Sequence, residues 1–363
     1  MNDKSMQAGH GGNIWAASRK WGQSPELFLD FSANINPLGP SKRSLNAINE
    51  SLGLLEHYPE PTCQELKHRL GVYLGIEPGY IVLGNGGSEL IYLLARIFGQ
   101  KRIVRLAPTF TEYGEGLERP HIVEVPLTAE NGFRLPLTEL MAVMEKGDLV
   151  FLGNPNNPTG NLFARSELEK VVRRASEVGA MVAIDEAFID FTGDRSKSMR
   201  DLATNTPVLV VLGSLTKFFA IPALRLGYAV AAKEHVKHLE KLLPAWRINA
   251  LAQAAAVAGL QDVEYIRQTV QVVDAEREFL VHGLEQIGGL KIHPSAANFL
   301  LVDGSQTGVK ANALQAKLGP EGILIRLCDN FSNLSPFHFR LAVRNRHDNE
   351  RLLGILEKVL VKA

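Results

Sequence analysis

The chain has 363 residues, more than one simple hydrophobic core organises, so two domains are expected. Lys and Arg together number 39, as do Asp and Glu, so no net charge favours nucleic acid or an acidic membrane surface as a partner. No apolar run reaches transmembrane length, and residues 1–12 lack the apolar core of a signal peptide. We therefore expect a cytoplasmic protein without a membrane partner.

The first forty residues are rich in Gly, Asn and Pro, and we expect them to drape over the main domain and pack on the functional site. From residue 81 onward, short apolar runs alternate with longer amphipathic ones, which is typical of a parallel α/β sheet with helices on both faces. The predicted strands are 81–84, 103–106, 149–153, 181–185, 208–212 and 226–231, and the predicted helices include 89–98 and 167–179.

The pattern changes near residue 249, where two long helices precede several short strands, as in a small α+β domain. The helices are 249–261, 263–287 and one from residue 349, and the strands are 299–302, 323–326 and 339–343. We therefore predict three parts: an N-terminal segment (1–40), a large domain with a mostly parallel sheet (41–262) and a smaller α+β domain (263–363). The two cysteines, Cys63 and Cys328, and the histidines show no metal-ligand spacing, so reduced thiols and no metal site are expected.

Lys217 is the first candidate functional residue. The run 213–217 places two hydroxyls and this lysine directly after a predicted strand, and Arg225 follows eight residues later. Hydroxyl donors and an arginine make a cradle for a phosphate dianion, and a lysine beside them can form an imine with an aldehyde. Taken alone, the run is equally well explained as a solvated loop.

Two carboxylates, Asp185 and Glu186, follow the apolar run 181–184. A buried carboxylate needs a cationic partner, and the pyridinium nitrogen of pyridoxal 5′-phosphate (PLP) is such a partner. A structural carboxylate that accepts backbone hydrogen bonds is the plain alternative.

Three other strand ends carry candidate ligand groups. The loop 154–160 fixes asparagine side chains where open α/β sheets bind ligands. The glycine-rich turn 84–88 opens a helix, whose first amides bind phosphate, and the run 108–113 offers aromatic rings that either stack on a ligand or belong to the core. Together the strand ends supply a phosphate cradle, a ring-stacking group, a carboxylate and an amine for one pocket.

These motifs resemble, in their order and spacing, the fold type I PLP-dependent enzymes of the histidinol-phosphate aminotransferase subgroup, and the resemblance covers nearly the whole chain. The resemblance rests on the motifs Asn-Pro-Asn-Asn-Pro-Thr-Gly (154–160), Asp-Glu-Ala-Phe (185–188), Ser-Leu-Thr-Lys (214–217) and the downstream arginine. It implies that Lys217 holds PLP as a Schiff base and that Asp185 pairs with the pyridine nitrogen. The further cofactor contacts that it implies are Gly86, Gly87, Ser88, Tyr113 stacked on the ring, Asn157 on the ring oxygen, Phe188, Ser214, Thr216 and Arg225. It also implies a homodimer in which Tyr58 reaches the cofactor phosphate of the other subunit.

Within this subgroup the chain is similar to the threonine-phosphate decarboxylases of cobalamin biosynthesis. The stretches that carry this similarity are His-Gly-Gly-Asn at 10–13, then 30–39 and 185–191. It implies decarboxylation of a small phosphorylated amino acid, O-phospho-L-threonine, bound by His10, Gly11, Asn34, Asn157, Arg326 and Arg340. Phe188 departs from the tyrosine usual in the aminotransferases, which removes a phenol that bonds the cofactor.

Several alternatives stay open at this point. A histidinol-phosphate aminotransferase uses the same cofactor apparatus, so the motifs around Lys217 do not decide, and residues 10–12 favour the decarboxylase. O-phospho-L-serine differs from the threonine compound by one methyl group, which a pocket discriminates by roughly 1–3 kcal/mol. An inactive regulatory protein is disfavoured because Lys217 is present, and a dinucleotide-binding oxidoreductase because the Gly-x-Gly-x-x-Gly fingerprint is missing.

Overall fold

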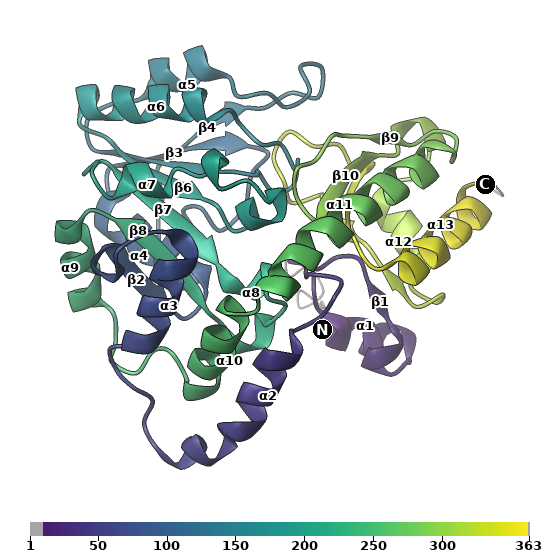
Figure 1. Ribbon diagram of the computed structural model, residues 1–363. Helices are drawn as coiled ribbons and strands as arrows, with labels where there is room; N and C mark the ends of the chain where they lie inside the picture. The colour runs from purple at the N-terminus through teal and green to yellow at the C-terminus, as the bar shows by residue number, and fades with distance from the viewer. Residues whose placement is uncertain (1–9, 362–363) are drawn as a thin grey trace.

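The computed structural model describes residues 10–361, and its framework is a seven-stranded sheet in the order β2-β8-β7-β6-β5-β3-β4 (Figure 1). The strands are β2 (Ile81–Gly84), β3 (Arg102–Ala107), β4 (Ile122–Pro126), β5 (Asp148–Gly153), β6 (Met181–Asp185), β7 (Leu209–Ser214) and β8 (Gly227–Ala231). All neighbours pair in parallel except β8, which runs antiparallel to both β2 and β7. The C-terminal ends of the six other strands therefore meet the N-terminal end of β8 at one edge of the sheet.

The sheet is buried on both faces because alternate side chains of each strand enter different cores. In β5, Val150 and Leu152 belong to one core, whereas Leu149 and Phe151 belong to the other. The first core includes side chains of α3 (Gln64–Leu74), α6 (Arg165–Val178) and α10 (Ala250–Leu260), and the second includes those of α4 (Gly87–Phe98) and α9 (Lys233–Leu242). Burial on both faces explains why these strands are continuous apolar runs in the sequence.

A smaller α+β domain follows, built on the antiparallel sheet β12-β13-β10-β9. Its elements are α11 (Val263–Glu285), β9 (Lys291–Ile292), β10 (Phe299–Asp303), α12 (Ala311–Leu318), β11 (Ile323–Leu324), β12 (Arg326–Leu327), β13 (His338–Ala342) and α13 (Arg346–Val361). The long helix α11 joins the domains, because Val273 packs in the core of the large domain and Leu280 in that of the small one (Figure 1).

The N-terminal segment differs from the expectation that it drapes over the main domain. Its helix α1 (Ile14–Trp21) and strand β1 (Leu29–Asp30) pack on the small domain, where β1 pairs in parallel with β11. The segment reaches the large domain at Asn36, whose side chain donates to the carbonyl of Phe218 (2.7 Å). A two-residue strand that pairs with a partner almost 300 residues away leaves no periodic signal in the sequence, so this placement was not predictable.

The predicted strands and crossover helices of the large domain are confirmed, with ends that shift by up to two residues. The predicted strand 323–326 is divided, because β11 pairs with β1 whereas β12 pairs with β13. The edge strand β4 was missed because its side chains are mostly part-exposed and include a glutamate. The other helices are α2 (Lys42–Glu50), α5 (Leu137–Val143), α7 (Arg200–Ala203) and α8 (Leu215–Phe218). Within residues 10–361, no helix combines the length and apolar character needed to cross a bilayer.

Candidate active site

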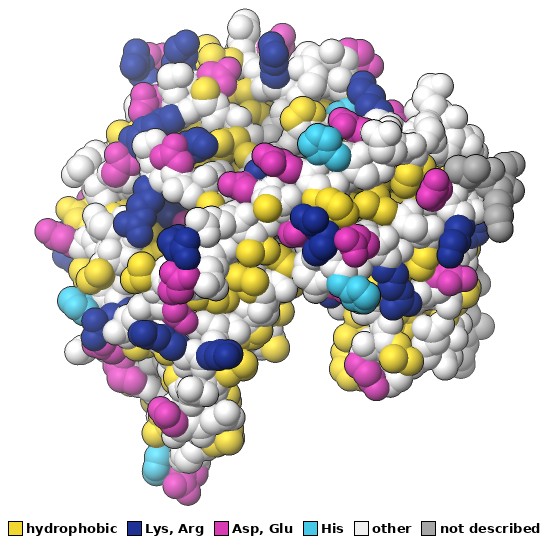
Figure 2. All heavy atoms as spheres, turned by 45° about the vertical axis from the view of Figure 1, so that its right-hand side comes forward, with side chains coloured by type: hydrophobic (Ala, Val, Ile, Leu, Met, Phe, Trp, Pro, Cys, Tyr) yellow, Lys and Arg dark blue, Asp and Glu magenta, His cyan; other side chains and the backbone are white. Residues whose placement is uncertain are grey.

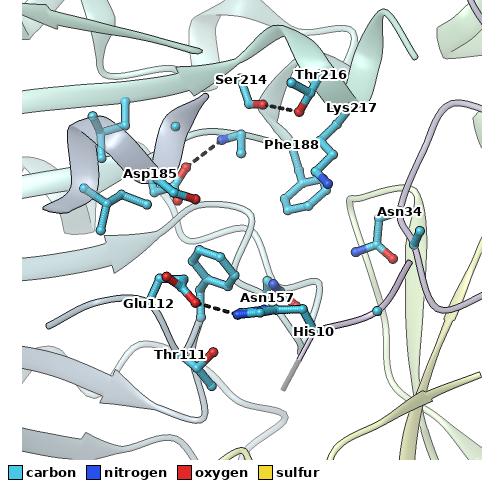
Figure 3. A pocket seen from close by; sticks show the side chains of 18 of the residues that line it. His10, Asn34, Thr111, Glu112, Asn157, Asp185, Phe188, Ser214, Thr216 and Lys217 are labelled. Carbon is cyan, nitrogen blue, oxygen red and sulfur yellow. Dashed lines mark hydrogen bonds and ion pairs between the residues drawn. The ribbon is translucent and has the colours of Figure 1, made fainter. Parts of the chain in front are cut away.

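A cavity of about 620 Å³ lies at the sheet edge where the strand ends meet, and both domains and the N-terminal segment line it (Figure 3). This volume is typical of a small-molecule site. The predicted site residues that line it are His10, Gly11, Asn34, Gly87, Ser88, Tyr113, Asn157, Asp185, Phe188, Ser214, Thr216, Lys217, Arg225, Arg326 and Arg340. The fold thus brings together predicted residues that are up to 330 positions apart in the chain.

Lys217 lies on α8, directly after β7, and its side chain points into the cavity (Figure 3). Burial lowers the pKa of this lysine to about 8, and the positive charges of Arg340 and Arg225 add to the effect. Asp185 opposes the shift but does not cancel it. A substantial fraction of Lys217 is therefore neutral near physiological pH, as imine formation with an aldehyde requires.

Asp185 is the last residue of β6, and both of its carboxylate oxygens accept hydrogen bonds. The amide of Ala187 donates to Oδ1 and the hydroxyl of Tyr113 donates to Oδ2, each at 3.0 Å. Burial nevertheless raises the pKa of Asp185 above its ordinary value. A cation at the cavity face of this carboxylate would favour its charged form, so the site suits the ring nitrogen of PLP.

Tyr113 lines the cavity and packs on a neighbouring strand. Its buried ring stacks on Phe151, with centroids 4.8 Å apart, while its hydroxyl serves Asp185. Phe110 belongs to the same loop, and its ring is only half-buried at the cavity wall. We propose Phe110 as the aromatic ring that lies against the cofactor, whereas the contact of Tyr113 with the cofactor stays a prediction. Sequence reasoning identified this loop but did not single out Phe110.

A phosphate cradle is formed where α4 begins. Gly86 precedes the helix with φ +84°, and no side chain caps the amides of its first turn. The hydroxyls of Ser214 and Thr216 lie 2.7 Å apart, and a Cβ on Gly86 would lie 2.6 Å from Nη2 of Arg225. The cradle therefore combines the free amides at the start of α4, two hydroxyls and the guanidinium of Arg225. A Cβ on Gly87 would meet nothing within 4 Å, so there is open space beside these groups. This donor set fits the phosphate of PLP.

Arg340 is a buried cation at the wall of the small domain. Its Nη2 donates to the carbonyl of Ser32 (2.9 Å) and its Nη1 to Oδ1 of Asn157, while its Nε has no partner. Burial lowers the pKa of Arg340 to about 9, and no carboxylate within residues 10–361 forms an ion pair with it. A buried guanidinium of this kind is stabilised by an anion that enters the cavity.

Of the remaining predicted residues, two lie in the cavity wall and one lies outside the cavity. Asn34 is buried with its Oδ1 unpartnered, and Phe188 packs edge-on against Phe299 with centroids 5.0 Å apart. Tyr58 lies outside the cavity, 80% exposed and 4.7 Å from the ring of Trp246. Its predicted contact with the cofactor needs a second subunit and stays a prediction.

A contact between His10 and Glu112, which the sequence did not predict, lies in the cavity lining. Nε2 of His10 lies 2.5 Å from Oε1 of Glu112 (Figure 3). The hydroxyl of Tyr92 donates to the other oxygen. His10 and Glu112 are 102 positions apart in the chain, so no local spacing indicated the pair.

The mostly parallel sheet, the small α+β domain, and the lysine and aspartate at adjacent strand ends define a type I PLP-dependent transferase fold. The chain belongs to the aminotransferase class I and II family, whose model matches residues 27–359, and PLP is the cofactor of this family.

Among curated proteins, the chain is 35% identical to the threonine-phosphate decarboxylase of Salmonella typhimurium, over 98% of this chain and 97% of that protein. It is 33% identical to the adenosylcobalamin biosynthesis bifunctional protein CobDQ of Leptospira interrogans, over 96% of this chain and 41% of that longer protein. Among solved structures, it is similar to the histidinol-phosphate aminotransferase of Clostridium acetobutylicum, with a TM-score of 0.86 and 32% identity, covering 92% of this chain and 99% of that one.

Proposed function

We propose that this protein is a PLP-dependent carboxy-lyase that converts O-phospho-L-threonine to (R)-1-aminopropan-2-yl phosphate for the nucleotide loop of cobalamin. The observation that carries the proposal is the joint presence of His10, Arg326 and Arg340 in the cavity of Lys217, in addition to the residues of the phosphate cradle. A substrate with both a phosphate and a carboxylate fits such a set of donors. The two decarboxylase and cobalamin relatives support this choice.

The described residues have separate tasks in the reaction. When bound, PLP supplies an electron sink for the negative charge that develops at the substrate α-carbon. Asp185, oriented by the hydroxyl of Tyr113, would hold a proton at the ring nitrogen. Lys217 would hold the cofactor, and its side chain, once released and protonated to the ammonium, would give a proton to the α-carbon in place of the departed carbon dioxide.

The arginines decide which bond breaks. The residues that hold the substrate would select the bond: a decarboxylase must expose the bond to the carboxylate to the electron sink, and an aminotransferase the bond to hydrogen. A tight pairing of the carboxylate with an arginine would stabilise the charge that must leave. Arg326 and Arg340 therefore hold mainly the phosphate group, and the carboxylate is less firmly neutralised.

Transamination of histidinol phosphate is the second candidate, because the similar structure from Clostridium acetobutylicum is of such an aminotransferase. The purified holoenzyme, incubated with O-phospho-L-threonine and no keto acid, separates the two. We expect catalytic release of carbon dioxide, with O-phospho-L-serine as the next substrate to compare. Conversion of the cofactor to its pyridoxamine form by histidinol phosphate, without carbon dioxide release from phosphothreonine, would favour the aminotransferase.

We also infer a homodimer in which Tyr58 of one subunit serves the cofactor of the other. Four large apolar side chains on α2 and the following turn (Leu52–Glu56) are exposed: Leu45, Leu52, Leu54 and Leu55. Figure 2 shows a hollow beneath the molecule, between the arm that carries α2 and the small domain, with hydrophobic side chains along it. A patch of this kind is typical of an interface between protein subunits.

Light scattering of the purified protein checks whether its mass in solution is that of a dimer. If Tyr58 reaches the cofactor of the other subunit, a Tyr58→Phe variant should bind PLP more weakly. The cytoplasmic location stays a prediction.

A further inference from the structure

Glu112 is a carboxylate in a cavity that we propose binds a phosphorylated substrate, and its charge would repel that substrate. Its side chain is only 13% exposed, and both oxygens are already occupied. Oε1 faces Nε2 of His10 at 2.5 Å, and Oε2 accepts from the hydroxyl of Tyr92. The carboxylate is thus part of a built arrangement.

The protonation of this arrangement fixes the direction of its hydrogen bonds. The bond from His10 lowers the pKa of Glu112, so this side chain is a carboxylate at neutral pH. The bond to Glu112 raises the pKa of Tyr92 to about 12, so the phenol keeps its proton and donates. Tyr92 on α4 therefore orients the carboxylate and leaves Oε1 for the imidazole.

The backbone next to His10 is held from the opposite side. We call residues 10–13 the N-terminal strap. The amide of Gly12 donates to Oγ of Ser32 (2.8 Å), and Gly11 approaches Ser32 so closely that a Cβ there would lie 2.0 Å from its carbonyl oxygen. The strap thus rests on Ser32, while the imidazole of His10, half exposed, extends to Glu112 in the large domain. Glu112 is the group that fixes the direction of the ring.

We propose that Glu112 is a positioning residue: by accepting a hydrogen bond from Nε2 of His10, it presents Nδ1 of the same ring to the phosphate group of the substrate. An imidazolium has two N–H donors, one for the carboxylate and one for the phosphate. The pair selects phosphorylated over unphosphorylated amino acids. This inference rests on the proposed function, since it takes O-phospho-L-threonine as the substrate.

Steady-state kinetics of the holoenzyme test the role of Glu112. The variants are Glu112→Gln, His10→Ala and the double variant, with Glu115→Gln as the matched control because Glu115 is an exposed carboxylate in the same loop. Each single variant loses one charge-assisted hydrogen bond, so its KM for O-phospho-L-threonine should rise roughly tenfold or more. We expect kcat to stay within about twofold, and the double variant to have a KM no higher than that of His10→Ala, because the two residues act as one unit. Glu115→Gln should behave as the parent enzyme.

Two results overturn the inference while the parent enzyme is active. One is a KM of Glu112→Gln equal to that of the parent, and the other is a double variant whose effect is the product of the two single effects. If the parent enzyme releases no carbon dioxide, the proposed function fails instead. In that case, calorimetric titration of the same holoenzymes with inorganic phosphate tests the role of Glu112 without the reaction. Equal dissociation constants for phosphate in the parent and in Glu112→Gln overturn the inference. A higher dissociation constant in Glu112→Gln supports it.

Discussion

Arg326 and Arg340 lie directly opposite each other on the adjacent antiparallel strands β12 and β13, and both are buried at the cavity wall. Side chains at opposed positions of a sheet lie side by side, so two like charges here destabilise each other. The charge of Arg326 is indeed one of the causes that lower the pKa of Arg340. A pair of this kind would be relieved by an anion that both can bind, which supports our proposal that the two arginines hold the phosphate of the substrate.

Removal of Arg340 should weaken substrate binding more than turnover. In Arg340→Ala we expect the KM for O-phospho-L-threonine to rise by about ten- to a hundredfold, which corresponds to the loss of one charge-assisted hydrogen-bonding group. The control is Arg346→Ala on α13, because Arg346 is half-exposed and pairs with Glu276. An Arg340→Ala enzyme that saturates at the same substrate concentration as the parent contradicts the phosphate role.

The depressed pKa of Lys217 predicts how cofactor loading depends on pH. Because the pKa is about 8, about half of the amine is neutral near pH 8, and well below that pH the neutral share falls roughly tenfold for each pH unit. The rate at which the apoenzyme captures PLP should therefore rise with pH through about 8 and level off roughly one unit higher. Arg340 is one cause of the low pKa, so Arg340→Ala should move the curve to higher pH. The absorbance of the bound cofactor gives the rate.

Tyr113→Phe should lower kcat at acidic pH. The hydrogen bond from Tyr113 lowers the pKa of Asp185 against the effect of burial, so its loss raises that pKa further. The carboxylate is then protonated at a higher pH, and the acid limb of kcat shifts upward. The ring of phenylalanine keeps the packing on Phe151, so we expect little change in the free energy of unfolding. An acid limb identical to that of the parent enzyme contradicts this role.

Gly86→Ala should weaken PLP binding. The new Cβ would lie 2.6 Å from Nη2 of Arg225, and φ is +84° at this position, which an alanine rarely adopts. We expect the dissociation constant for PLP to rise at least tenfold, as measured by fluorescence titration of the apoenzyme. Gly354→Ala is the control, because a Cβ there meets nothing within 4 Å. Equal PLP affinity in both variants would argue against the cradle.

The sequence predicted the large sheet and the residues at its strand ends because buried parallel strands are continuous apolar runs, and their loops follow in chain order. It did not predict contacts that depend on the placement of separate elements. The pairing of β1 with β11 and of His10 with Glu112 joins positions with no shared local pattern. The facing arginines depend on strand register, which two-residue strands such as β12 do not specify. Phe110 and Tyr113 are both aromatic, and only their burial distinguishes them.

The decisive measurement is the release of carbon dioxide from O-phospho-L-threonine by the purified holoenzyme, with no keto acid present. We expect many turnovers per active site and none in Lys217→Ala, because we propose that Lys217 holds the cofactor and returns the proton. If carbon dioxide is not released while histidinol phosphate converts the cofactor to its pyridoxamine form, the protein is an aminotransferase and the decarboxylase account is wrong.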